Sequence, residues 1–120
     1  MRVYLAGPEV FLPDALEVAA AKKRVCAAHG LEGVFPLDPP PMLPPGERPY
    51  WLRIYLGNEA HIRASDALIA NLTPFRGPSA DAGTVFELGF MRALGRPVMG
   101  YSNAAADFLD RTRGFLGAAA

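Results

Sequence analysis

Residues 66–101 read DALIANLTPFRGPSADAGTVFELGFMRALGRPVMGY and contain the pattern that decides the fold. The apolar run from Ala67 to Leu72 is typical of a buried strand. After a loop, a helix is expected from about Ala82 to Leu94, because a capping residue precedes its apolar positions and a glycine follows them. A second apolar run from Pro97 to Tyr101 predicts another strand. The stretch is therefore predicted to form a strand, a helix and a second strand.

The same alternation extends to both ends of the chain. The expected elements are a strand at Val3–Ala6, a helix at Ala15–Ala28, a strand at Val34–Leu37, a helix at Tyr50–Ser65 and a last helix at Ala104–Leu116. Strands that alternate with helices of this length pair in parallel through crossovers. The sequence predicts an α/β fold, a doubly wound parallel sheet of about four to five strands with helices on both faces.

Composition limits the partners of the chain. A length of 120 residues, with 51% hydrophobic and 20% charged side chains, predicts a single domain over residues 1–120. Twelve basic and twelve acidic side chains cancel, so the expected partners are small molecules or other protein surfaces rather than nucleic acid or a membrane. Cys26 is the only cysteine, and no segment has the pattern of a signal peptide or a membrane helix. A cytoplasmic location is expected.

Ligands of open α/β sheets bind outside the carboxyl ends of the strands. This rule selects the loops at Gly7–Leu12, Leu37–Pro49 and Thr73–Asp81 as the candidate binding region. Asp66, in contrast, precedes a strand at the opposite edge, so we expect it to cap structure. The histidines have no partner at metal-ligand spacing and are expected to be structural or exposed.

Glu87 is the most informative residue of the helix at Ala82–Leu94. Its neighbours at helical spacing are apolar or small, so its carboxylate should face the sheet. Burying an unpaired carboxylate costs several kcal/mol, about as much as the stability of a small domain. Glu87 is therefore expected either to pair with a buried arginine or tyrosine hydroxyl, or to carry out chemistry.

Several polar and aromatic side chains surround the same edge. Asp81 is placed to cap the helix, which leaves one oxygen for a ligand, and Gly83 allows a ligand to approach the backbone. Asn58 interrupts an apolar helical stripe, so its amide satisfies either nearby backbone groups or a ligand. Tyr4 and Phe11 are core aromatics by default, although a phenol beside a buried glutamate would orient it.

Three segments together resemble the nucleoside 2-deoxyribosyltransferase family. They are YLAGPEVF at 4–11, SDALIANLTPFRG at 65–77 and DAGTVFELG at 81–89. The resemblance implies a flavodoxin-like fold and the transfer of 2-deoxyribose between purine or pyrimidine bases, with no metal or organic cofactor. It also implies that the glutamate matching Glu87 attacks the anomeric carbon and forms a glycosyl-enzyme, so that two inversions give net retention.

The resemblance also assigns roles to single residues. Tyr4 matches the tyrosine that orients the nucleophile, and Asp81 matches the aspartate that binds deoxyribose hydroxyls. Asn58 stands where some members have a catalytic aspartate and others have asparagine, and an amide cannot act as a general acid. Gly7 and Phe11 are expected to line the sugar and base pocket. A related branch that hydrolyses deoxynucleoside 5′-monophosphates has serine at the position of Asp81, so nucleosides are favoured over nucleotides here.

Family members usually continue for another strand and helix, which reach into a neighbouring subunit's site. This sequence stops at Ala120, so the resemblance predicts a core that lacks that segment. The expected partners are nucleosides, free nucleobases and further copies of the chain in a dimer or larger homo-oligomer. Two alternatives stay open: an N-glycoside hydrolase that uses the same glutamate on nucleosides or nucleotides, and a non-catalytic nucleoside-binding module.

Overall fold

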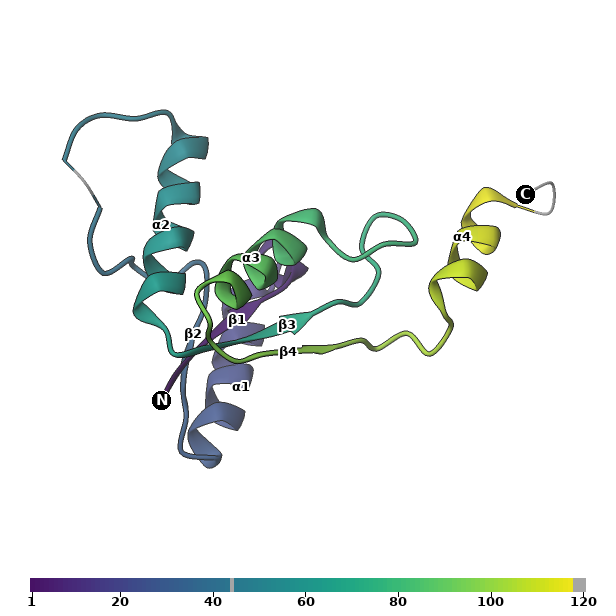
Figure 1. Ribbon diagram of the computed structural model, residues 1–120, viewed down its shortest axis with the longest axis horizontal. Helices are drawn as coiled ribbons and strands as arrows, with labels where there is room; N and C mark the ends of the chain where they lie inside the picture. Colours follow the sequence, from purple (N-terminus) through teal and green to yellow (C-terminus); the bar gives the residue numbers. More distant parts are fainter. Residues whose placement is uncertain (44, 118–120) are drawn as a thin grey trace.

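The computed structural model describes residues 1–43 and 45–117, and these form one four-stranded parallel sheet (Figure 1). The strands are β1 (Arg2–Ala6), β2 (Glu32–Val34), β3 (Ala67–Asn71) and β4 (Val98–Tyr101). Their order across the sheet is β2-β1-β3-β4. The predicted α/β fold with a parallel sheet is confirmed.

Helices cover both faces of this sheet. The structure contains the 3₁₀ helix η1 (Pro8–Phe11) and the α-helices α1 (Ala15–Ala28), α2 (Tyr50–Ala64), α3 (Ala82–Ala93) and α4 (Phe108–Leu116). Figure 1 shows α1 on one side of the sheet, α2 and α3 on the other, and α4 projecting beyond the end of β4. No helix within the described residues is both long and apolar enough to cross a membrane.

The core follows the two-residue period of β1. Tyr4 and Ala6 point to the side of α2 and α3, where they belong to a buried cluster with Met91. Val3 and Leu5 point to the opposite side and pack in a cluster that includes Cys26 of α1. Since β1 is buried on both faces, its sequence is a continuous apolar run rather than an alternating one.

The strand order creates a switch point between β1 and β3. From β1 the chain crosses through α1 to β2 on one side, whereas β3 pairs with β1 on the other side. In sheets of this kind, the crevice outside the carboxyl ends of the two central strands is where ligands bind. The segment after β1 and the loop between β3 and α3 both begin at this crevice.

Two predicted elements differ from the structure by more than one residue. The second strand is Glu32–Val34 rather than Val34–Leu37, because the Asp38 side chain accepts a hydrogen bond from Phe35 N, at 2.9 Å, in a turn that ends the strand. The last helix begins at Phe108 rather than Ala104. Its start is fixed by the Asp107 side chain, which accepts a hydrogen bond of 2.8 Å from Asp110 N as an N-cap.

Candidate active site

A cavity of about 520 Å³ opens at the carboxyl ends of β1 and β3, between α2 and α3. Its lining residues come from five segments: Gly7, Val10 and Phe11 after β1, Pro36 and Leu37 after β2, Tyr50, Trp51, Ile54, Tyr55, Asn58, Glu59 and Ile62 of α2, Asp81 before α3, and Gly83, Phe86, Glu87 and Phe90 of α3. A cavity of this size holds a small organic ligand. The cavity therefore lies at the crevice where the fold places ligands.

Glu87 and Tyr4 form the buried polar pair of this region. Glu87 lies on the inner face of α3 and is 9% exposed, while Tyr4 of β1 is fully buried. The Tyr4 hydroxyl donates a hydrogen bond to Glu87 Oε2. The tyrosine-hydroxyl partner proposed for a buried glutamate is thus present, and the carboxylate lines the cavity at the same time.

Burial shifts the ionisation of both groups. Desolvation raises the pKa of Glu87 to about 7; the hydrogen bond from Tyr4 opposes this rise, and the nearby negative charge of Asp81 adds to it. Burial and the charge of Glu87 raise the pKa of Tyr4 far above its usual value. The phenol therefore stays protonated as a donor, whereas the carboxyl changes charge near neutral pH.

Asp81 caps α3 and faces the cavity. Its Oδ2 accepts hydrogen bonds from the backbone N and the Oγ1 of Thr84, both at 3.0 Å. Within the described residues, Oδ1 has no hydrogen-bond partner, so it is available to a ligand hydroxyl. Gly83 lines the same part of the cavity, and an added Cβ there would lie 3.3 Å from Asp81 Oδ2. The predicted cap is confirmed.

Asn58 lies among aromatic side chains that form the other wall of the cavity. Its side-chain amide makes no hydrogen bond within residues 1–43 and 45–117, which leaves both of its polar atoms for a ligand. Tyr55 and Phe86 have ring centroids 6.2 Å apart, and Phe86 and Phe90 are equally close. Trp51 lines the cavity although 69% of it is exposed. Flat aromatic surfaces beside an amide suit a heteroaromatic base.

Gly7 and Phe11 form the wall that follows β1. Phe11 stacks on Phe75, with centroids 5.5 Å apart and planes inclined by 14°. The guanidinium of Arg76 lies 4.9 Å from the Phe11 ring and 4.7 Å from the Phe75 ring. This cluster joins the segment after β1 to the loop after β3, so the two sides of the switch point are in contact.

Six of the seven predicted site residues line one cavity, and the seventh, Tyr4, contacts it through Glu87. The aromatic wall was not predicted from the sequence, because Trp51 and Tyr55 belong to the apolar stripe of α2, and such a stripe is typical of a helix that packs on a core. Glu59 also lines the cavity, and its Oε1 accepts a hydrogen bond of 3.1 Å from Arg63 Nε. Nothing in the sequence around Glu59 distinguishes it from an ordinary exposed helical glutamate.

Residues that were expected to be structural lie away from the cavity. Asp66 accepts a hydrogen bond of 2.7 Å from Arg2 N at the amino edge of the sheet. His61 is buried, with Nε2 2.8 Å from Asp38 O, and Cys26 is buried and unpaired. In the described part of the chain, no group of three or more His, Cys, Asp or Glu side chains is arranged to hold a metal ion.

Comparison with known proteins gives a consistent match. The model of the nucleoside 2-deoxyribosyltransferase family matches residues 3–117. An uncharacterised protein of Schizosaccharomyces pombe is 35% identical in an alignment 118 residues long, which covers 94% of this chain and 55% of that protein. The chain thus spans about half the length of this curated relative.

Solved structures show the same relationship. A 2-deoxyribosyltransferase from Leishmania mexicana is 35% identical with a TM-score of 0.69, over 86% of this chain and 65% of that one. A conserved protein from Enterococcus faecalis is 26% identical with a TM-score of 0.64, over 87% and 65%. A 2-deoxyribosyltransferase from Bacillus psychrosaccharolyticus, 22% identical with a TM-score of 0.66 over 94% and 91%, shares the fold.

Proposed function

Because the chain belongs to the nucleoside 2-deoxyribosyltransferase family, we propose that it transfers 2-deoxyribose from one purine or pyrimidine base to another in the cavity between α2 and α3. The observation that carries the proposal is the buried Glu87 carboxyl, which lines the cavity and is held by the Tyr4 hydroxyl. A buried carboxyl with a single oriented donor is a suitable nucleophile, because it is only partly solvated and fixed in direction.

The reaction is proposed to proceed in two displacements. The ionised Glu87 carboxylate forms a bond to C1′ of the nucleoside while the bond from C1′ to the departing base breaks, and that base takes up a proton. A nitrogen of the incoming base then bonds to C1′ while the glutamyl ester bond breaks, and this base loses a proton. Each displacement inverts C1′, so the product retains the configuration of the substrate.

The surrounding side chains have distinct proposed roles. Tyr4 orients the carboxylate, and Asp81 Oδ1 accepts a hydrogen bond from a sugar hydroxyl. The amide of Asn58 holds the base at the aromatic wall but does not supply its proton, because an amide does not titrate in this range. Gly7 and Phe11 close the opposite side.

Asp81 also favours nucleosides over nucleotides. A phosphate placed at its carboxylate would be repelled by about 1 to 4 kcal/mol for charges about 4 Å apart at high to intermediate dielectric. We therefore propose that an uncharged sugar 5′ end is preferred. A comparison of deoxyinosine with its 5′-monophosphate as donors measures this preference, and equal use of the two contradicts it.

Base exchange tests the proposed function directly. Wild-type protein incubated with deoxyinosine and adenine should form deoxyadenosine and hypoxanthine, and the Glu87→Gln variant should form neither. Glu32→Gln is the matched control, because it removes a carboxylate whose ion pair with Arg2 lies at the opposite edge of the sheet. Free deoxyribose without exchange would identify a hydrolase instead, and nucleoside binding without any product would identify a binding module.

The covalent step has its own test. Protein quenched during reaction with deoxyinosine, in the absence of an acceptor base, should carry one deoxyribosyl unit on the peptide that contains Glu87. Mass spectrometry of the digested protein locates the modified residue. An active enzyme that never carries this adduct would indicate direct displacement and overturn the two-step mechanism.

Self-association is also part of the proposal. Helix α4 has no buried residue, and four large apolar side chains on it are exposed: Phe108, Leu109, Phe115 and Leu116. Such a helix is covered when it packs on another subunit. Light scattering of the purified chain should give a mass of at least two copies, and a monomer at high concentration would contradict this part. A cytoplasmic location stays a prediction.

A further inference from the structure

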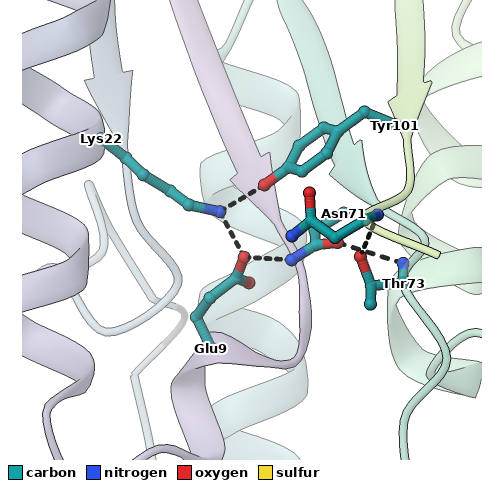
Figure 2. Close-up of polar contacts among 6 residues, drawn as sticks. Glu9, Lys22, Asn71, Thr73 and Tyr101 are labelled. Atoms are coloured by element: carbon teal, nitrogen blue, oxygen red, sulfur yellow. Dashed lines mark hydrogen bonds and ion pairs between the residues drawn. The ribbon is translucent and has the colours of Figure 1, made fainter.

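A second polar cluster, centred on the buried Glu9, lies outside the lining of the cavity (Figure 2). Glu9 of η1 is 5% exposed, and its Oε1 accepts hydrogen bonds from Lys22 Nζ and, at 2.6 Å, from Asn71 Nδ2. Lys22 also donates to the Tyr101 hydroxyl at 2.5 Å, and Asn71 Oδ1 accepts from Thr73 N at 3.1 Å. The cluster therefore joins η1 to α1 and to the ends of β3 and β4.

The Glu9–Lys22 pair is ionised at neutral pH. Burial alone would raise the pKa of Glu9, but the hydrogen bonds from Lys22 and Asn71 hold it below its usual value. Burial alone would lower the pKa of Lys22, and its bonds to Glu9 and Tyr101 hold it above its usual value. A buried ion pair adds little stability relative to apolar residues, and its better attested use is to fix one geometry.

Glu9 touches the segment that forms one wall of the cavity. An ideal Cβ on Gly7 would lie 2.0 Å from Glu9 Oε2, so the carboxylate packs directly on the backbone where β1 ends. Gly7, Val10 and Phe11 line the cavity, whereas Glu9 is not part of its lining. Figure 2 shows the Glu9 carboxylate pointing toward Lys22 and Asn71. The same four-residue turn thus presents one side to the cavity and the other to the cluster.

Local interactions hold this segment only weakly. The 3₁₀ helix η1 has four residues, and Gly7 at its start offers no side-chain cap. Its closing backbone bond joins Leu12 N to Glu9 O at 3.0 Å. Short 3₁₀ turns have poorer hydrogen-bond geometry than α-helices and need support from their surroundings. The side-chain bonds of Glu9 supply that support from two other elements, α1 through Lys22 and β3 through Asn71.

We propose that Glu9 is a positioning residue, whose carboxylate is held by Lys22 and Asn71 and fixes the Gly7–Phe11 wall against the substrate. This inference rests on the proposed function for its substrate, but the position of the wall can be measured without one. Glu87, the proposed nucleophile, and Tyr4, which orients it, lie on α3 and β1, and within the described residues neither forms a hydrogen bond with Glu9. Loss of the carboxylate should therefore weaken substrate binding more than it slows the chemical step.

Two variants test this role: Glu9→Gln and the double variant Glu9→Gln with Lys22→Met. In Glu9→Gln, KM for deoxyinosine should rise about tenfold while kcat stays within about threefold of wild type, because uniform binding is lost. Trp51 is the single tryptophan and lines the cavity, so its fluorescence reports Kd for deoxyinosine directly. Kd should rise with KM, and Glu32→Gln should change neither.

The double variant separates positioning from stability. Removing both charges leaves no unpaired buried ion, so the double variant should be more stable than Glu9→Gln. Its KM and Kd should nevertheless stay raised, because the carboxylate that packs on Gly7 is still missing. If KM and Kd return to wild-type values together with stability, Glu9 is merely structural and the proposal is wrong.

Amide hydrogen exchange provides the readout that needs no substrate. Residues 7–12 should exchange faster in Glu9→Gln than in wild type, while β1 and α1 keep their protection. If the wild type neither exchanges the bases of nucleosides nor hydrolyses nucleosides, the proposed function fails. Amide hydrogen exchange then still decides the role of Glu9. If the wild type is active and Glu9→Gln matches it in KM, Kd and amide exchange, the positioning role fails and the function stands.

Discussion

The Tyr4 hydroxyl donates a hydrogen bond to Glu87 Oε2 although the two residues are 83 positions apart in the sequence. The contact forms because α3 packs on the face of the sheet toward which Tyr4 points from β1. Glu87 lies on the inner side of α3, facing that strand. It joins a permanent donor to a carboxyl whose pKa is about 7. Three predictions follow from the charge of this carboxyl.

Tyr4→Phe should slow the reaction and change its pH dependence. Without the phenol, the interaction that lowers the pKa of Glu87 is lost, so this pKa should rise above its wild-type value of about 7. A plot of kcat/KM against pH should show its ascending limb at higher pH, with kcat lower by about tenfold. Tyr101→Phe is the matched control and should leave the midpoint in place. An unchanged midpoint in Tyr4→Phe would contradict the assignment.

Glu87→Gln should make the protein more stable at alkaline pH. The Glu87 carboxyl binds more protons in the folded than in the unfolded state between pH 4.5 and about 7. The stability from this protonation is complete below pH 4.5 and is lost as the pH rises through about 7. Glutamine does not titrate, so the variant does not lose stability in this way as the pH rises. Its side-chain oxygen still accepts the hydrogen bond from Tyr4.

The measurement is denaturant unfolding of both proteins across the pH range. Between about pH 4.5 and about pH 8, the unfolding free energy of wild type should fall relative to that of Glu87→Gln by up to about 3 kcal/mol. Other titrating groups are common to both proteins and cancel in the difference. A difference that is constant with pH would mean that the pKa of Glu87 is not raised in the folded state.

Substitutions of Asp81 should separate its cap from its charge. Asp81→Ala removes the acceptor of the Thr84 bonds and should cost about 1 kcal/mol of unfolding free energy. Asp81→Asn keeps an acceptor and should cost much less. Both remove a negative charge that raises the pKa of Glu87, so the ascending limb of the pH profile should move to lower pH. Equal unfolding free energies of the two variants would show that Asp81 does not stabilise α3 as an N-cap. An ascending limb at the wild-type pH would show that the charge of Asp81 does not raise the pKa of Glu87.

Gly7→Ala should damage the protein through Glu9. The new methyl group would meet Glu9 Oε2 at 2.0 Å and Asn71 Cβ at 3.0 Å. Because Lys22 and Asn71 hold the carboxylate, it cannot simply turn aside, and we expect a loss of about 1 to 3 kcal/mol of stability with a raised KM. In a double-mutant cycle, Glu9→Ala should reduce the effect of Gly7→Ala. Additive effects would show that the two residues do not interact.

The sequence alone predicts the site well where a residue breaks a local pattern. Glu87 is recognisable because a carboxylate interrupts an apolar helical face, and Asp81 because it stands at a helix start. The second strand was misplaced because Phe35 and Leu37 continue the apolar run of Val34, and only the turn made by Asp38 ends the strand. Local pattern therefore predicts elements better than it predicts their ends.

Contacts between distant segments explain what was missed. Glu9 has no unusual neighbours in sequence, and its partners Lys22 and Asn71 lie 13 and 62 positions away. The aromatic wall joins Tyr55 to Phe86 only because α2 and α3 pack on the same face of the sheet. Such groupings depend on the tertiary fold, so no local periodicity indicates them.

Arg96→Met should destabilise the protein without changing how it binds nucleosides. Arg96 Nη1 donates to three carbonyl oxygens at the end of α2: Ile62 O at 3.1 Å, Arg63 O at 2.8 Å and Ser65 O at 2.8 Å. The last carbonyls of a helix have no partner within it, and a cation is favourable there. Loss of these charged hydrogen bonds should cost about 2 kcal/mol, measured by denaturant unfolding.

Arg92→Met is the control, because Arg92 is exposed on α3, whereas Arg96 contacts the end of α2. It should change the unfolding free energy by less than about 0.5 kcal/mol. The Trp51 fluorescence titration should give wild-type Kd values in both variants, because the cavity lies at the other end of the sheet from Arg96. An Arg96→Met protein as stable as wild type would show that the hydrogen bonds from Arg96 to the end of α2 do not stabilise the fold. A raised Kd would show that the end of α2 also controls the position of Asn58.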